Sequence, residues 1–368
     1  MPSLEPLFTP FRLKNLELPN RIVMAPMTRS KSPGQMPDAD VAAYYRRRAE
    51  GGVGLILTEG TSPDDPAASG DINVPSFFGE AALAGWANVL KEVKAAGGRI
   101  MPQLWHQGLL RKHGTGPYPQ RPSVSPSGLT SSGKQVGEPM TAAEIGATVA
   151  GFARSAASAR RLGFDGVEIH GAHGYLIDEF FWDGTNRRDD AYGGTIAKRA
   201  HFAAEIVRAV RAATAPDFPI LLRFSQWKQQ DFTAKLAQTP RELEEFLAPL
   251  AAAGVDAFHC STRRYWEPEF PGEGSDLNLA GWTKKISGLP TITVGSVGLD
   301  EEFVASFQGK DARTHDINRL LDMFARGDFD LVAVGRALLA NPDWPLKMRE
   351  GRFEALKPFT RDVLQTLS

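Results

Sequence analysis

Eight short apolar segments, separated by segments with helical character, constrain the fold of this chain more than any other feature. The apolar segments are residues 22–26, 53–60, 99–105, 167–170, 220–225, 257–262, 291–296 and 331–336. Nearly continuous apolar runs of this kind are typical of parallel strands that are buried on both faces. A count of eight favours a closed (β/α)8 TIM barrel over an open doubly wound sheet. The first strand is also not followed by the G-x-G-x-x-G fingerprint of a dinucleotide-binding fold.

The segments between these strands contain recognisable helix signals. Thr141 and Glu144 have the spacing of a capping box, and Thr239 is followed by proline at the first helical position. The expected helices are residues 40–50, 80–96, 141–162, 198–213, a helix from 239 onward, and 316–326. Residues 7–19 predict a short N-terminal hairpin, and residues 106–139 predict a long Pro/Gly/Ser-rich connection. We expect one barrel domain over residues 1–368.

Composition excludes several classes of function. A formal net charge of −1 argues against nucleic acid as a main partner. No apolar run approaches the length that spans a bilayer, and the first residues do not resemble a signal peptide, so we expect a cytoplasmic protein. Cys260 is the only cysteine, which excludes an intramolecular disulfide and a cysteine-ligated iron–sulfur cluster. Nothing in the sequence indicates an oligomeric state.

The fourth apolar segment leads into a stretch that combines small residues with polar rings. His170, His173 and Tyr175 follow one another there at short spacing. Three such rings among glycines can hold a small oxygen atom and deliver a proton beside it, so they are candidate catalytic and substrate-binding residues. Histidines at a strand end can equally be satisfied core residues. A metal site at the H-x-x-H spacing is weaker, because no matching third ligand stands nearby.

Two glycine-containing strand ends predict a phosphate site. Gly295 and Ser296 end the seventh strand, and Gly335 and Arg336 end the eighth. The loops after these two strands are the recurrent phosphate-binding position of the barrel fold, where backbone N–H groups and an arginine meet the anion. Their coincidence indicates a phosphorylated ligand.

Three further strand-end residues favour a planar, phosphorylated ligand. Gln103 and Thr28 offer donor and acceptor groups for the edge of a heterocycle, and Arg223 offers a cation beside it. A lone arginine at a strand end is often a structural ion-pair partner. Together with the phosphate site, however, the three residues suggest flavin mononucleotide (FMN), because a guanidinium near a flavin favours its reduced form.

Six separated motifs, in this order along nearly the whole chain, resemble the Old Yellow Enzyme family of FMN-dependent ene-reductases. They are Asn20–Arg29, Thr58–Gly60, Gln103–Gly108, His170–Tyr175, Asn186–Gly194 and Val334–Arg336. The resemblance implies a flavoprotein oxidoreductase that takes hydride from NADH or NADPH. It also implies small-molecule activated alkenes as substrates, and it leaves the physiological alkene open.

The resemblance assigns a role to each matching position. It implies that the residues in contact with FMN are Ala25, Pro26, Met27, Thr28, Gly60, Gln103, Arg223, Gly295, Ser296, Gly335 and Arg336. His170 and His173 would bind the activating oxygen of the substrate, Tyr175 would donate the proton, and Trp105 would lie at the substrate pocket. For residues 186–194 a structural role at the start of a helix is the better interpretation.

The chain also departs from the family pattern. Thr28 stands where one branch of the family has a cysteine, so a redox-tuning thiol is absent there. Many members carry a tyrosine near position 363, whereas this chain has none from 351 onward. That side of the pocket must be built differently. The charged aromatic segment 263–269 is either part of the pocket rim or a solvated loop with an ion pair.

Three functions fit the residues taken together. The preferred one is reduction of an activated C=C bond, in an α,β-unsaturated carbonyl or nitro compound, by an NAD(P)H-dependent FMN enzyme. The alternative is a non-redox, phosphate-binding barrel lyase or isomerase that uses His170 or His173 as its base. A flavin-binding protein without turnover is the third.

Overall fold

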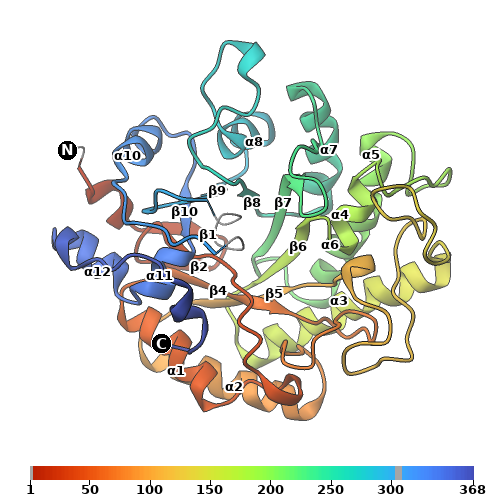
Figure 1. Ribbon diagram of the computed structural model, residues 1–368, viewed down its shortest axis with the longest axis horizontal. Coiled ribbons are helices and arrows are strands. Elements are labelled where there is room, and N and C mark those ends of the chain that lie inside the picture. Colours follow the sequence, from red (N-terminus) through yellow and green to blue (C-terminus); the bar gives the residue numbers. More distant parts are fainter. Residues whose placement is uncertain (1–2, 303–308) are drawn as a thin grey trace.

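Eight parallel strands close into a barrel in the order β10-β3-β4-β5-β6-β7-β8-β9, and helices surround it (Figure 1). The computed structural model describes residues 3–302 and 309–368. The strands are β3 (Ile22–Met24), β4 (Leu55–Thr61), β5 (Ile100–Leu104), β6 (Val167–His173), β7 (Ile220–Lys228), β8 (Ala257–Ser261), β9 (Thr291–Val294) and β10 (Leu331–Val334). The predicted (β/α)8 barrel is therefore confirmed.

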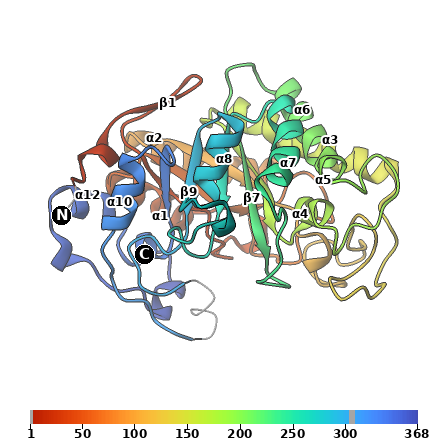
Figure 2. The same cartoon turned by 90° about the horizontal axis from the view of Figure 1, so that it is seen from above.

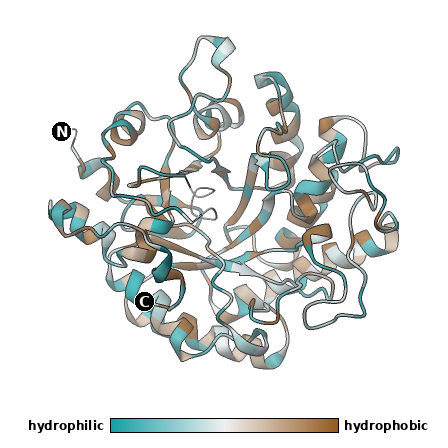
Figure 3. Cartoon of the chain, viewed as in Figure 1, coloured by the Kyte–Doolittle hydropathy of each residue, from teal (hydrophilic) through white to brown (hydrophobic). Residues whose placement is uncertain are grey.

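The helices alternate with the strands around the barrel. They are α1 (Ala39–Glu50), α2 (Glu80–Ala95), α3 (Ala142–Leu162), α4 (Leu176–Phe181), α5 (Ile196–Arg199), α6 (His201–Ala213), α7 (Pro240–Ala253), α8 (Leu279–Ser287), α10 (Asn318–Ala325), α11 (Arg336–Ala340) and α12 (Trp344–Arg349). Apolar colour is concentrated on the strands and on parts of the helices, and loops are mostly polar (Figure 3). None of the helices in the described part of the chain is long and apolar enough to cross a bilayer.

The predicted N-terminal hairpin is formed by β1 (Phe11–Leu13) and β2 (Leu16–Leu18). Its three leucines, Leu13, Leu16 and Leu18, are buried in one cluster with inward-facing residues of the barrel strands. Lys14 Nζ donates to Pro216 O, which lies just before β7 begins. The hairpin therefore closes the amino-terminal end of the barrel, and Figure 2 shows it on that side of the molecule.

Local capping signals in the sequence set the helix starts as predicted. The Thr141 side chain accepts from Glu144 N at 3.2 Å, and the Glu144 carboxylate accepts from Thr141 N at 2.7 Å. Thr239 caps α7 in a similar way, by accepting from Glu242 N. The helix expected over 198–213 is divided at Ala200 into α5 and α6, and Thr195 caps the first of them.

Two strands run further than the sequence pattern indicates. β6 continues to His173 and β7 to Lys228, whereas the apolar runs end at residues 170 and 225. The pairing shifts register between Gly171 and His173 and resumes with His173 opposite Lys228. Irregularities of this kind re-aim side chains next to functional sites. The extension breaks the apolar pattern because it includes His173, which lines the cavity, and Lys228, which is paired with Asp178.

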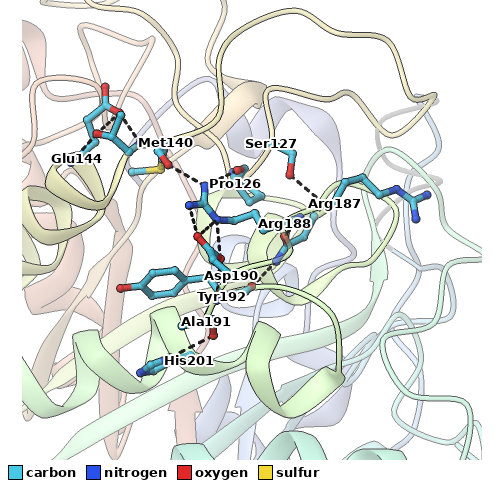
Figure 4. A network of polar contacts seen from close by, with 12 residues as sticks. Pro126, Ser127, Met140, Glu144, Arg187, Arg188, Asp190, Ala191, Tyr192 and His201 are labelled. Carbon is cyan, nitrogen blue, oxygen red and sulfur yellow. Dashed lines mark hydrogen bonds and ion pairs between the residues drawn. The ribbon is translucent and has the colours of Figure 1, made fainter.

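The long connection between β5 and α3 is held by arginines bonded to backbone carbonyls. Arg111 is buried and donates to four carbonyl groups, three of them within the connection itself. Arg188, from the turn before α5, donates to Pro126 O at 2.8 Å and Met140 O at 2.7 Å and is paired with Asp190 (Figure 4). The segment 186–194 thus ties this connection to the helices, in keeping with the expected structural role.

Replacing Arg188 by alanine removes two charge-assisted bonds to that connection. We expect the free energy of local opening to fall by about 1.5–3 kcal/mol. Limited proteolysis within residues 106–139 should then be faster by at least about tenfold. Arg187→Ala is the matched control, because the Arg187 side chain is exposed and only its backbone N–H binds Ser127. Equal cleavage rates for both variants would contradict the assignment.

Candidate active site

The carboxyl ends of the strands surround a cavity of about 480 Å³, which is in the size range of small-molecule and cofactor sites. Of the sequence-predicted site residues, all but Gly60 line it. These are Ala25, Pro26, Met27, Thr28, Gln103, Trp105, His170, His173, Tyr175, Arg223, Gly295, Ser296, Gly335 and Arg336. These residues come from six of the eight strands or from the loops that follow them, and they meet at one place.

Gly60 lies behind this wall instead of in it. A Cβ atom at position 60 would come within 2.6 Å of the Trp105 indole ring. The absence of a side chain on β4 thus lets Trp105 pack against the strand and place its ring in the cavity wall. The contact of Gly60 with FMN that the family resemblance implies stays a prediction.

His170, His173 and Tyr175 form a cluster of edge-to-face rings. The ring centroids of His170 and His173 are 5.1 Å apart, and those of His170 and Tyr175 are 5.2 Å apart. Trp105 meets the Tyr175 ring edge-on at 4.9 Å, and Trp227 stacks on His173 at 4.5 Å. The predicted catalytic residues are therefore brought together at one side of the cavity.

A strained turn between β6 and α4 places these rings. His173 and Gly174 both have positive φ, of 64° and 79°. Position 174 favours glycine, because its φ of 79° lies in the left-handed region that side chains rarely adopt, and a Cβ there would also displace the Gln230 amide. Asp178, in the first turn of α4, accepts from Gly174 N at 2.7 Å and forms an ion pair with Lys228 at 2.5 Å. Both charged side chains are fully buried, so this pair fixes the turn that presents His173 and Tyr175.

Both histidines are uncharged at neutral pH. Burial, followed by the positive charge of Arg223, lowers the pKa of His170 and of His173 well below the ordinary value of 6.5. His170 Nδ1 accepts from Ala172 N at 3.3 Å, so the proton of this neutral ring is on Nε2. Burial also raises the pKa of Tyr175, which keeps its hydroxyl proton available for donation. Gln229 donates to that hydroxyl oxygen at 2.8 Å.

A buried polar layer lies at the level of β5 to β8 in the barrel interior. Gln103 Nε2 donates to Glu168 at 2.7 Å, and the other carboxylate oxygen of Glu168 is 2.7 Å from His259 Nδ1. Because Glu168 takes only one amide N–H, Gln103 retains a carbonyl oxygen and a second N–H for a ligand. Arg223 is buried, and its Nε has no protein partner among the described residues. Burial lowers the pKa of Arg223, and the charge of Glu168 partly offsets this effect.

The lining of the cavity is cationic. Among the described residues that line the cavity there is no aspartate or glutamate, whereas five are arginines: Arg29, Arg223, Arg263, Arg336 and Arg361. Burial lowers the pKa of Arg336 to about 10, so it stays positively charged at neutral pH. Its guanidinium donates to the backbone carbonyls of Glu301 and Glu302. Gly295 and Ser296 both have positive φ, as the turn after β9 requires.

Several lining residues were missed by sequence reasoning. Trp227 comes from the extension of β7, Gln229 directly follows that strand, and Ser261 ends β8. The segment 263–269 combines both expected roles: Arg263 lines the cavity and is paired with Glu302, and Arg264 forms an exposed ion pair with Glu267. Trp227 and Gln229 could have been found from the sequence, because an aromatic and an amide side chain closely follow the predicted end of a strand. A single serine such as Ser261 gives no comparable signal.

The C-terminal tail forms the wall on which a tyrosine was missing. Leu364 and Arg361 line the cavity from this tail. Arg29, next to Thr28, donates to Thr366 O at 2.7 Å and Val363 O at 3.1 Å. The tail is thus bound to the same loop that carries the candidate flavin-contact residues.

The sequence matches the model of the NADH:flavin oxidoreductase / NADH oxidase family over residues 6–355. The chain belongs to the Old Yellow Enzyme family. An NADH oxidase of Thermoanaerobacter brockii is 34% identical over 353 residues, which are 94% of this chain and 51% of that protein, so the chain spans about half of this relative. The 12-oxophytodienoate reductase 1 of Oryza sativa subsp. japonica is 32% identical over 97% of this chain and 88% of its own length.

Solved Old Yellow Enzyme structures share the fold as well. Morphinone reductase in complex with tetrahydroNAD superposes with a TM-score of 0.80 at 30% identity, over 97% of this chain and 93% of that one. The cofactor of this Old Yellow Enzyme is accordingly FMN. The donor set fits FMN. The cavity offers the Gln103 amide, the buried Arg223 whose Nε has no partner among the described residues, and further arginines in a described lining that contains no carboxylate.

Lys228→Met tests the buried pair under the turn. It leaves Asp178 without its cation in a fully buried position, which typically costs about 3–5 kcal/mol of unfolding free energy. Chemical denaturation of the holoprotein measures this loss. Arg241→Met is the control, since Arg241 and its partner Glu245 are 86% and 47% exposed and their pair should contribute at most about 1 kcal/mol. Similar losses in the two variants would contradict the role assigned to Lys228.

Proposed function

We propose that this Old Yellow Enzyme is an ene-reductase, which takes hydride from NADH or NADPH and reduces the C=C bond of activated alkenes such as α,β-unsaturated carbonyl or nitro compounds. The observation that carries the proposal is the meeting of His170, His173 and Tyr175 in one cavity whose described lining contains five arginines and no carboxylate. The family membership and the reductase names of the relatives support it.

The cofactor contacts follow from the arrangement of the cavity. Gln103 and Thr28 would bind the polar edge of the isoalloxazine, and Arg223 would stabilise negative charge on the ring. The backbone of Ala25, Pro26 and Met27 would lie along the ring system, and Gly60, paired with Gln103 across the sheet, would contact its pyrimidine edge. The phosphate would be held by Gly295, Ser296, Gly335 and Arg336. FMN, when bound, supplies the hydride chemistry that the side chains of this chain lack.

The side chains bind and polarise the substrate. His170 and His173 would donate hydrogen bonds to the carbonyl or nitro oxygen and stabilise the charge that develops on it. Tyr175 would give its hydroxyl proton to the α-carbon, and Gln229, bonded to the same oxygen, would stabilise the phenolate that remains. Trp105 would close the pocket over the substrate through its edge contact with Tyr175.

A non-redox lyase or isomerase with a histidine base is not favoured. Such an enzyme needs an imidazole that takes up a proton near neutral pH. Burial and Arg223 hold the pKa of both histidines well below that range. The family match points the same way.

The wider biological setting is also part of the proposal. We propose that residues 1–368 act as one FMN-binding unit in the cytoplasm, with small molecules and neither nucleic acid nor membrane as partners. The formal net charge of −1 and the single, buried cysteine support this setting. Which alkene is physiological, and which nicotinamide is preferred, are not specified by these residues.

Tyr175→Phe removes only the hydroxyl group and therefore tests proton delivery. Reduction of the bound flavin by NAD(P)H should be little altered, since that half-reaction does not use this proton. Reduction of an unsaturated ketone should slow by about 10²-fold. Stopped-flow measurement of both half-reactions separates the two effects. Equal slowing of both would mean a general disturbance of the pocket and would remove Tyr175 from the acid role.

Arg336→Ala tests the phosphate assignment. Loss of a charge-assisted hydrogen bond worth about 1.5–3 kcal/mol should raise the Kd for FMN by about 10–100-fold. Dilution or dialysis of the holoprotein with fluorescence detection of released flavin measures this constant. Arg241→Ala, at an 86% exposed position far from the cavity in sequence, provides the control. FMN retention equal to that of the control would exclude Arg336 from the phosphate site.

The depressed histidine pKa values also predict a pH profile. A histidine of ordinary pKa would gain a proton as the pH falls through 6.5 and would change kcat/KM there. Because the pKa of His170 and of His173 is lower, both rings stay neutral and neither should contribute an inflection to the profile for an uncharged ketone between pH 6 and about pH 8. An inflection near 6.5 that disappears on His173→Ala would contradict this.

A further inference from the structure

The hydroxyl group of Ser261 lies between the cation of the cavity and one of the substrate histidines. Ser261 is 2% exposed at the carboxyl end of β8. Its Oγ is 3.1 Å from Arg223 Nη2 and 2.8 Å from His173 Nε2. The three side chains come from neighbouring strands β6, β7 and β8, which fixes their spacing. Arg223, Ser261 and His173 thus form a continuous hydrogen-bonded chain.

The direction of the hydrogen bonds in this chain follows from the donors available. A guanidinium can only donate, so Ser261 Oγ accepts from Arg223. The hydroxyl has one proton of its own, and among the described residues His173 Nε2 is the acceptor that contacts Oγ. His173 Nε2 therefore accepts the Ser261 proton. Because His173 is neutral, its own proton is on Nδ1.

Packing holds the His173 ring in one orientation, so the position of its proton decides which ring nitrogen can donate. Trp227 stacks on it with an interplanar angle of 26°, and the Trp227 indole N–H donates to the backbone carbonyl of Ser261 at 3.2 Å. The His173 backbone N–H is bonded to Ser225 Oγ at 2.9 Å. A ring packed in this way cannot exchange its two nitrogens by turning over without breaking these contacts.

We propose that Ser261 is a positioning residue that fixes His173 as the Nδ1–H tautomer and so makes it a hydrogen-bond donor toward the substrate oxygen. The proposal deepens the ene-reductase function and rests on it for its catalytic consequence. His170 reaches the same result through the other nitrogen, because its Nδ1 accepts from Ala172 N and its Nε2 carries the proton. Two neutral imidazoles then donate through different ring atoms.

The opposite tautomer would make the site unsuitable for an oxygen ligand. With the proton on Nε2, His173 would donate to Ser261 and its Nδ1 lone pair would be the group left for a ligand. A lone pair repels a carbonyl or enolate oxygen. The Ser261 proton would also lack an acceptor in a buried position, and an unmade buried hydrogen bond costs about 1–3 kcal/mol.

Nitrogen-15 NMR of the FMN-loaded protein with labelled histidine measures the tautomer directly. The His173 signals are identified by their loss in His173→Gln. We expect a protonated Nδ1 and an unprotonated, hydrogen-bonded Nε2 in the wild type at pH 7.5. Ser261→Ala should shift His173 to the Nε2–H form or to a mixture, and Ser261→Thr, which keeps the hydroxyl, should restore the wild-type pattern. An Nε2–H wild type, or an unchanged pattern in Ser261→Ala, would overturn the proposal.

Binding of para-substituted phenols to the oxidised holoprotein supplies a second readout. Loss of one donor should raise their Kd by about 5–10-fold in Ser261→Ala. Ser132→Ala, an exposed change in the 106–139 connection, should leave it unaltered. Failure of the proposed function is distinguishable: a protein with the expected tautomer that does not reduce alkenes loses the function and keeps the role of Ser261. A protein that reduces alkenes but has the Nε2–H tautomer of His173 keeps the proposed function and loses the role of Ser261.

Discussion

Closure of the parallel sheet is the constraint on which the rest of the structure depends. β10 pairs with β3, so that Val332 lies opposite Ile22 although 310 residues separate them in sequence. Once the sheet is closed, all eight strands end at one mouth, and polar residues from distant parts of the chain must meet there. The hairpin leucines fill the other end, so apolar burial and chemistry are divided between the two ends of one barrel.

Charge placement makes the mouth suited to an anionic cofactor and a neutral substrate group. Carboxylates near the site are turned away from the cavity and used within the protein: Glu168 binds Gln103 and His259, and Asp178 binds Lys228. Burial, and after it the charge of Arg223, lowers the pKa of the histidines, and the arginines along the cavity are the groups proposed to hold the phosphate. A neutral histidine can donate a hydrogen bond to an oxygen, and in the proposed mechanism the proton transfer falls to Tyr175.

The fold and much of the site could be predicted because their signals are local. The cap at Thr141, the apolar strands and the run from His170 to Tyr175 are each contained within a few residues of sequence. The roles of Ser261 and Lys228 could not, because they depend on side chains brought close only by strand pairing. Lys228 follows a bulge that the apolar pattern does not show, and its burial is set by Asp178 on another element. For the C-terminal tail, the sequence showed only that the tyrosine of other family members is missing. The contact that places the tail joins Arg29 to Thr366, which lie near opposite ends of the chain.

The central claim is that one cavity holds FMN and passes hydride from a nicotinamide to an activated alkene. Anaerobic titration of the purified holoprotein, followed by its visible spectrum, tests it most directly. The account predicts a flavin spectrum that is bleached by NADH or NADPH and restored in equimolar amount by an unsaturated ketone. A protein that stays colourless after FMN is added, or one whose bleached flavin is not restored by any activated ketone or nitroalkene, would contradict it.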